Sequence, residues 1–276
     1  MIAGARVALP IMGSLMGLST IAGVYILTNR AGHFPPGAST PPISLLGCNS
    51  PEHLYYQVGF VLTGLILLAA IDQWRRSSFY DHIHRSFGSF SAKIMLLGGY
   101  LAVVGVIGQG IVTLEENFLL HIKEGRGMSF QSILHQQLAG VFFLGAAMHC
   151  YATAYYILST TRSWRNSFGR IKLQNIIASE GVSCCYRVWS VRLKLLCVIT
   201  SFLAVPIAEG MHPTRTHRLE KRNLNIAGMA QYIAVASYII FFGSYSLDFA
   251  STSERGVAPA EESQMSTRIR KGPKSS

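Results

Sequence analysis

The stretch IMLLGGYLAVVGVIGQGIVTL, residues 94–114, contains no charged side chain over 21 consecutive positions. A helix needs about 20 mainly apolar residues to cross the hydrocarbon core of a bilayer. Because lipid offers no hydrogen bonds, every backbone N–H and C=O must be satisfied inside the segment, which a helix achieves. The sequence therefore predicts a transmembrane helix at this position.

Five further stretches have the same character, so we expect an all-α membrane protein built as a six-transmembrane helix bundle. The predicted spans are 7–28, 54–71, 94–114, 136–158, 188–208 and 225–247. Only 13% of the 276 residues are charged, against roughly 25% in soluble domains. In the fifth span we expect Arg192 and Lys194 to extend to the lipid headgroups. The first span could alternatively be a cleaved signal peptide, with Arg6 as its basic flank.

Basic residues predict the topology of the six spans. The side that holds both termini and the connections 73–93 and 159–194 carries 17 of the 24 Lys and Arg residues. Cytosolic loops carry this excess in membrane proteins, so we expect both termini in the cytosol. The net charge of +11 is then a signature of topology. No segment forms a soluble basic domain, so no nucleic-acid partner is expected.

The chain divides into a membrane domain, residues 1–249, and a tail, residues 250–276, rich in Ser, Glu, Arg and Lys. We expect the tail to be disordered and cytosolic, where it and the cytosolic loops can bind protein partners. Residues 160–187 mix basic with aromatic and aliphatic side chains. This pattern suits a helix on the inner leaflet, bound to anionic phosphoinositides, although topology alone explains the same charges.

The five cysteines do not predict a disulfide or a metal site, and no cofactor is expected. Only Cys48 lies in a predicted exoplasmic loop, so no exoplasmic pair exists. Cys184 and Cys185 lie in the cytosolic connection a few residues from a span. They are either an S-palmitoylation site or two ordinary reduced thiols.

Polar residues at membrane depth are costly and therefore mark candidate sites. His135 and His149 are 14 residues apart, which places both on roughly one face of the fourth helix. Gln109 and Gln231 could meet that face, and this convergence would suit a channel or transporter. Alternatively, His149 is neutral, buried and hydrogen-bonded to a backbone carbonyl.

Carboxylates and imidazoles also gather in the predicted exoplasmic loops. The second loop contains Glu115, Glu116, His121, Glu124 and His135, and the first ends in Glu52 and His53. These types can move a proton, although their spacing matches no metal motif and a solvated acidic loop is the alternative. If the protein is an enzyme, the catalytic candidates are Glu52, Glu115, Glu116 and His135.

The first exoplasmic loop is rich in proline. Five of the ten prolines lie in residues 35–51, within and before PPISLLGCNSPEHLYY, residues 41–56. Proline fixes φ and restricts the residue before it. We therefore expect an ordered segment that presses on the outer mouth of the bundle and fixes the start of the second helix.

Several short motifs resemble those of the damage-regulated autophagy modulators and the transmembrane protein 150 group. They are PPIS and SPEHLYY, GQGIV followed by acidic residues, His135 at the start of the fourth helix, MHP, and LDF at the end of the sixth. The resemblance covers residues 35–249, and its motif residues are Pro42, Ser44, Pro51, Glu52, Asp248 and Phe249. The wider six-helix superfamily also contains Golgi factors that remodel GPI-anchor lipids and a fungal plasma-membrane partner of phosphatidylinositol 4-kinase.

This resemblance implies a regulator of autophagy or a scaffold for phosphoinositide-kinase machinery, in lysosomal, other endomembrane or plasma membranes. The alternative is a Golgi factor in GPI-anchor lipid remodelling. Members commonly carry a Glu before an aromatic residue in the last helix, where this chain has Gln231 and Tyr232. If that Glu takes part in chemistry, an equivalent activity is in doubt here.

Overall fold

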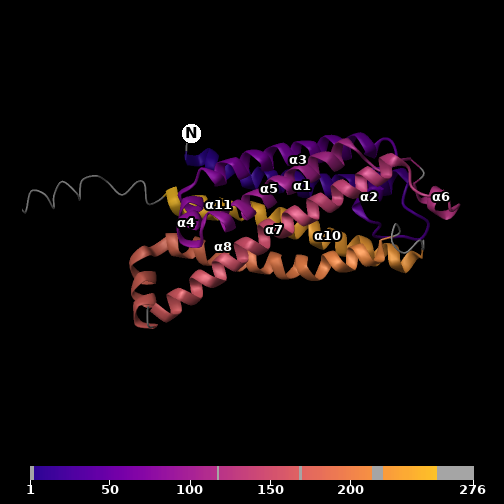
Figure 1. The fold of residues 1–276 in the computed structure, drawn as a ribbon. Coiled ribbons are helices and arrows are strands. Elements are labelled where there is room, and N and C mark those ends of the chain that lie inside the picture. Colours follow the sequence, from indigo (N-terminus) through magenta and orange to yellow (C-terminus); the bar gives the residue numbers. More distant parts are fainter. Residues whose placement is uncertain (1–2, 117, 168–169, 213–219, 254–276) are drawn as a thin grey trace, which may run out of the picture.

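The computed structural model describes residues 3–116, 118–167, 170–212 and 220–253, without the side chains of residues 3–6, 78–79, 82, 86–87, 89, 160–188 and 251–253. Within these ranges the chain is helical and contains no strand (Figure 1). The helices are α1 (Ala3–Ala31), α2 (Ile43–Leu46), α3 (Glu52–Arg75), α4 (Ser78–Phe87), α5 (Ser89–Ile111), α6 (Phe118–Lys123), α7 (Phe130–Ser167), α8 (Arg170–Met211), α10 (Lys221–Gly243) and α11 (Tyr245–Ser253).

Six helical stretches are long and apolar enough to cross a membrane, which confirms the predicted all-α fold with six spans. They are Val7–Ala31, Glu52–Arg75, Phe90–Ile111, Phe130–Ser159, Trp189–Met211 and Lys221–Ala250. Large apolar side chains also cover their outer surface: Leu15, Leu144 and Phe202 are 62%, 60% and 63% exposed. Such a surface fits lipid, and together these features indicate an integral, multi-pass membrane protein.

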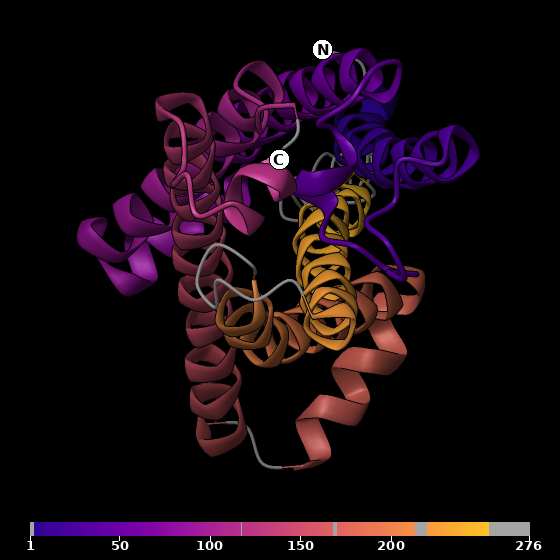
Figure 2. The same cartoon turned by 90° about the vertical axis from the view of Figure 1, so that its right-hand side faces the viewer.

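The bundle has two distinct ends. The end with α2 and α6, called here the α2 end, also contains the connections 32–51 and 112–129 (Figure 1). The opposite end, the α4 end, contains α4, α11 and the start of α1, so the two ends of the described chain lie on the same side. Figure 2 views the molecule from the α2 end, with α10 between α1 and α8.

Helices α5 and α7 approach each other through their backbones. A Cβ on Gly98 of α5 would lie 2.7 Å from the backbone nitrogen of His149 and 2.8 Å from the carbonyl oxygen of Gly145. Similarly, a Cβ on Gly145 would overlap the backbone nitrogen of Ala102. Since lipid removes the hydrophobic drive between helices, this close packing is a main source of their association.

We expect Gly145→Ala to destabilise the bundle by about 1–3 kcal/mol, because the added methyl meets backbone that cannot move aside. Gly140→Ala is the matched control, since nothing lies within 4 Å of a Cβ at that position. Thermal unfolding of the two purified variants in detergent measures the difference. Equal midpoints would contradict the proposed role of the α5–α7 contact.

His149 is buried and bonded at both ring nitrogens. Nδ1 lies 2.7 Å from the Met95 carbonyl oxygen on α5, and Nε2 lies 2.6 Å from the Tyr245 hydroxyl on α11. Because a carbonyl only accepts, Nδ1 carries the proton and Nε2 is left to accept the Tyr245 O–H. The geometry agrees with the alternative in which His149 bonds a backbone carbonyl, and it makes this imidazole a connection among three helices.

Lys194 corrects an expectation from the sequence. Its side chain does not extend to a headgroup but is 1% exposed, with Nζ 2.8 Å from Asp248 Oδ2 on α11. Ser190, one turn earlier on α8, bonds both residues and lies 2.6 Å from Asp248 Oδ1. Arg192, in contrast, is exposed as expected. The physical reason is that α11, which continues from α10, packs against α8 and supplies a counter-charge inside the bundle.

We expect Asp248→Asn to destabilise the protein by about 3–5 kcal/mol, because it leaves the buried Lys194 ammonium without its counter-charge. The double variant Lys194→Met with Asp248→Asn should recover most of the loss, since the buried charge is removed as well. Asp72→Asn is the control, because Asp72 pairs with the exposed Arg76. Thermal midpoints of the three variants test this, and a double variant as unstable as Asp248→Asn would contradict it.

Candidate functional site

The proline-rich segment, residues 32–51, closes the α2 end and is called here the lid segment. Its residues 41–47 are buried. Asn225 Oδ1 on α10 accepts from the backbone N–H groups of Ser39 and Thr40, both at 2.9 Å. Gln231 Oε1, two turns further along α10, accepts from Ile43 N–H at 2.7 Å. The lid segment is therefore fastened to α10, as expected of a segment pressed on the bundle.

Glu52 begins α3 and is fully buried. Its Oε1 lies 2.6 Å from Nδ1 of His33, just after the end of α1, and the His33 side chain is 35% exposed. The other carboxyl oxygen, Oε2, has no hydrogen-bond partner among the described residues. A carboxylate at a helix N-terminus is stabilised by the helix dipole. The pair thus joins α1 to α3 and leaves one carboxyl oxygen available inside the site.

Cys48 lies between the two acidic groups of this end. Burial raises the pKa of its thiol to about 12, and the negative charges of Glu52 and Glu115 add to the effect. Such a thiol stays protonated and unreactive at neutral pH.

His53 follows Glu52, but its Nδ1 donates to the Gly47 carbonyl at 3.0 Å, so it holds the end of the lid segment.

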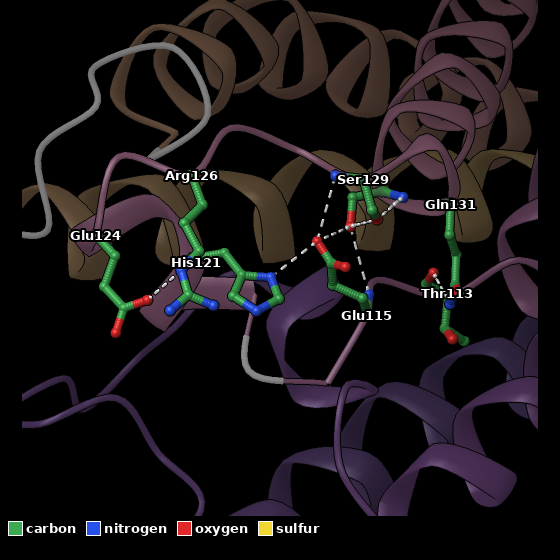
Figure 3. A network of polar contacts seen from close by, with 8 residues as sticks. Thr113, Glu115, His121, Glu124, Arg126, Ser129 and Gln131 are labelled. Atoms are coloured by element: carbon green, nitrogen blue, oxygen red, sulfur yellow. Dashed lines mark hydrogen bonds and ion pairs between the residues drawn. The ribbon is translucent and has the colours of Figure 1, made fainter.

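Glu115 stabilises the start of α7 (Figure 3). Its Oε1 accepts from Ser132 Oγ at 3.2 Å and from the Ser129 backbone N–H at 3.4 Å, and it pairs with His121 Nδ1 at 3.4 Å. Partial burial acts to raise the pKa of Glu115, but the hydrogen bonds from Ser129, His121 and Ser132 outweigh it and lower that pKa. Glu115 therefore holds the N-cap residue Ser129, whose own Oγ accepts from the Ser132 backbone N–H.

The remaining acidic candidates lie outside this arrangement. Glu116 is exposed, and Glu124 pairs with Arg126 at 2.7 Å near the surface (Figure 3). Across the described ranges, no group of three or more His, Cys, Asp or Glu side chains is placed to hold a metal ion. The structure thus pairs Glu52 with His33 and Glu115 with His121, and it places Glu116 and Glu124 apart from both pairs.

His135 resembles His149 in its use of a backbone carbonyl. It is fully buried near the start of α7, and its Nδ1 lies 2.6 Å from the carbonyl oxygen of Val112 at the end of α5. Its Nε2 has no partner within the part of the chain that the structure describes. Both histidines therefore lie on the α5-facing side of α7, as their spacing predicts.

Gln109 and Gln231 border the same space in the bundle, and His149 does not border it. Both border a cavity beneath α2, together with Ser44 of the lid segment. His149 lies further toward the α4 end, among Trp74, Phe242 and Tyr245, with ring centroids 5.4, 5.0 and 5.7 Å away. The three polar groups expected to converge are thus separated into two environments.

Sequence reasoning missed His33, Asn225 and the burial of Lys194. His33 and Asn225 lie in polar flanks where many side chains are solvated. The spacing of Ser190 and Lys194, four residues apart on an apolar helix, was an available signal for a buried polar partner. Cys184 and Cys185 lie on α8, but their side chains are outside the described set, as is the tail after Ser253.

Comparison with known proteins adds no relative: no family model, no curated protein and no solved structure matches this chain.

We expect Glu115→Ala to cost about 1 kcal/mol of stability at pH 7, because the hydrogen bonds that hold Ser129 and Ser132 at the start of α7 are lost. Because the folded pKa lies below the unfolded value near 4.5, this contribution is present above that value and is lost as the pH falls through the folded pKa. Thermal unfolding of wild type and variant at neutral and acidic pH measures it. The exposed Glu116→Ala is the control, and a loss independent of pH would contradict the carboxylate's role.

Proposed function

We propose that the protein is a multi-pass membrane regulator without catalysis of its own, which modulates autophagy or holds phosphoinositide-kinase machinery at a membrane. The subfamily resemblance of the sequence motifs suggests these two processes. The observation that carries the proposal is a rim of exposed basic and aromatic side chains at the α4 end.

The basic rim consists of exposed side chains from four helices: Arg75, Arg76, Arg85, Lys93 and Arg192. Beside them, Phe90 and Trp189 are 76% and 58% exposed, and the Arg192 guanidinium lies 5.8 Å from the centre of the Trp189 ring. Exposed aromatic rings at the end of a span suit the headgroup region. Each basic residue there is attracted to anionic lipid by about 1 kcal/mol. The rim therefore suits a cytosolic leaflet rich in anionic phosphoinositides.

The interior supports the same proposal, because its polar groups bond helices to one another. His149 joins α7 to α5 and α11, and Lys194 joins α8 to α11. Ser14 of α1 donates to the Ile239 carbonyl of α10 at 2.7 Å. Groups used in this way make a rigid bundle, which suits a platform that presents a surface to partners.

Cells that lack the protein should turn over an autophagic cargo reporter more slowly, and re-expression of the wild type should restore the rate. The triple variant Arg76→Gln, Lys93→Gln, Arg192→Gln should reach the same compartment without restoring turnover, since three attractions of about 1 kcal/mol are lost. The control removes three exposed charges at the α2 end: Lys123→Gln, Arg126→Gln, Lys221→Gln. Normal turnover in the deletion cells, or full rescue by the rim variant, would contradict the proposal.

The second candidate is a role in GPI-anchor lipid remodelling, favoured by the buried Glu52 and its contact with His33. A carboxylate with one unpaired oxygen beside an imidazole is a pair that can accept and return a proton. Here, the tagged wild type should reside steadily in the Golgi, and cells that lack the protein should carry altered lipid on surface GPI proteins. Glu52→Ala should fail to correct that lipid, and Glu116→Ala should correct it. Normal GPI lipid in the deletion removes this candidate.

A further inference from the structure

A cavity lies directly beneath α2, within the bundle. Its lining contains four side chains with polar atoms, Ser44 of α2, Tyr56 of α3, Gln109 of α5 and Gln231 of α10. The rest of its wall is apolar or aromatic, and it includes Phe60 and Phe142. The polar groups thus lie at one end of a largely apolar space.

The hydrogen bonds of the two glutamines fix what each presents to the cavity. Gln231 uses Oε1 to accept from Ile43 N–H, which leaves its NH₂ group as the remaining donor. Gln109 donates Nε2 to the Gly105 carbonyl at 3.4 Å, which leaves Oε1 as the remaining acceptor. Between them, Ser44 is 5% exposed and its hydroxyl has no partner among the described residues.

The polar side chains that line the cavity favour a ligand group without charge. No charged side chain borders the cavity, so a phosphate or an ammonium would lose its hydration without gaining a counter-charge. A hydroxyl fits, because it can donate to Gln109 Oε1 while it accepts from Gln231 Nε2 or Ser44 Oγ. Where Ser44 Oγ is the donor, a buried hydroxyl that has no partner among the described residues gains one.

An apolar space continues from the same cavity toward the middle of the bundle. A second cavity shares Phe60, Val106, Phe142 and Val235 with the first and ends among Leu67 and Phe242. Each cavity has room for about one water molecule in this structure, so a larger apolar group would have to displace the rings of Phe60 and Phe142 that border both cavities. The two cavities together are polar at one end and apolar at the other, which matches the distribution of polar and apolar groups in an amphiphilic molecule.

We propose that the cavity beneath α2 binds the hydroxyl group of a neutral lipid, whose apolar body extends past Phe60 and Phe142. Sterols and diacylglycerols both carry this chemistry. The site lies at the end opposite the basic rim and does not depend on the regulatory function proposed above.

The test uses the full-length protein in phosphatidylcholine nanodiscs with two photoactivatable probes, a sterol and a diacylglycerol. One of them should label residues that border the cavity, and its unlabelled parent should compete. Ser44→Ala should reduce this labelling about threefold to tenfold, the effect of one lost hydrogen bond. Without lipid, the same variant should be as stable as wild type or more so, because it removes an unpaired buried hydroxyl. Ser39→Ala, exposed in the same segment, is the control.

Two further arms decide the outcome. Gln231→Glu keeps the acceptor for Ile43 N–H but removes the amide donor, so labelling should fall while the lid segment stays fastened. A probe with its hydroxyl capped as a methyl ether should label weakly. Equal labelling of wild type and Ser44→Ala, labelling by both probes only on lipid-facing residues such as Leu15 and Leu144, or a high-resolution map with a single ordered water in the cavity would overturn the proposal.

Discussion

The rest of the bundle depends on the direct backbone contact between α5 and α7. In lipid, helices gain little from burying apolar surface, so association relies on close packing and on hydrogen bonds between helices. Here Gly98 and Gly145 allow the close approach, and His149 and His135 lock it at the two ends by donating to carbonyls of Met95 and Val112. The contact fixes the start of α7, and with it the connection that carries Glu115 and His121.

Six spans could be predicted because hydropathy is a local property that each stretch carries by itself. The ordered lid segment could be predicted for a similar reason, since proline restricts its own backbone and that of its neighbour. The partners could not be predicted. Lys194 is buried because Asp248, 54 residues later, lies 2.8 Å away. His33 and Glu52 come into contact only because α1 and α3 pack antiparallel. The separation of the two residues in the sequence therefore does not predict the pair.

Gln231 illustrates how one side chain serves two requirements. Its carbonyl oxygen holds the lid segment through Ile43 N–H, a task that a carboxylate at this position would perform equally well. Its amide group keeps that position uncharged, in a region whose other polar members, Ser44 and Gln109, are also neutral. A glutamine rather than a glutamate at position 231 therefore holds the lid segment without placing a negative charge in the space beneath it.

The lid segment also constrains the order of assembly. It is synthesised directly after the first helix, but the side chain that holds Ser39 and Thr40 comes from Asn225, 186 and 185 residues later. The Ser14 bond to Ile239 joins residues 225 apart. During synthesis the lid segment therefore has only its bonds to nearby helices, such as those from Tyr25 and Thr28 of α1, until the last helix is made. A chain that stops before α10 would lack the bonds from Asn225 and Gln231, so attachment of the lid segment to the last helix is a property of the complete bundle alone.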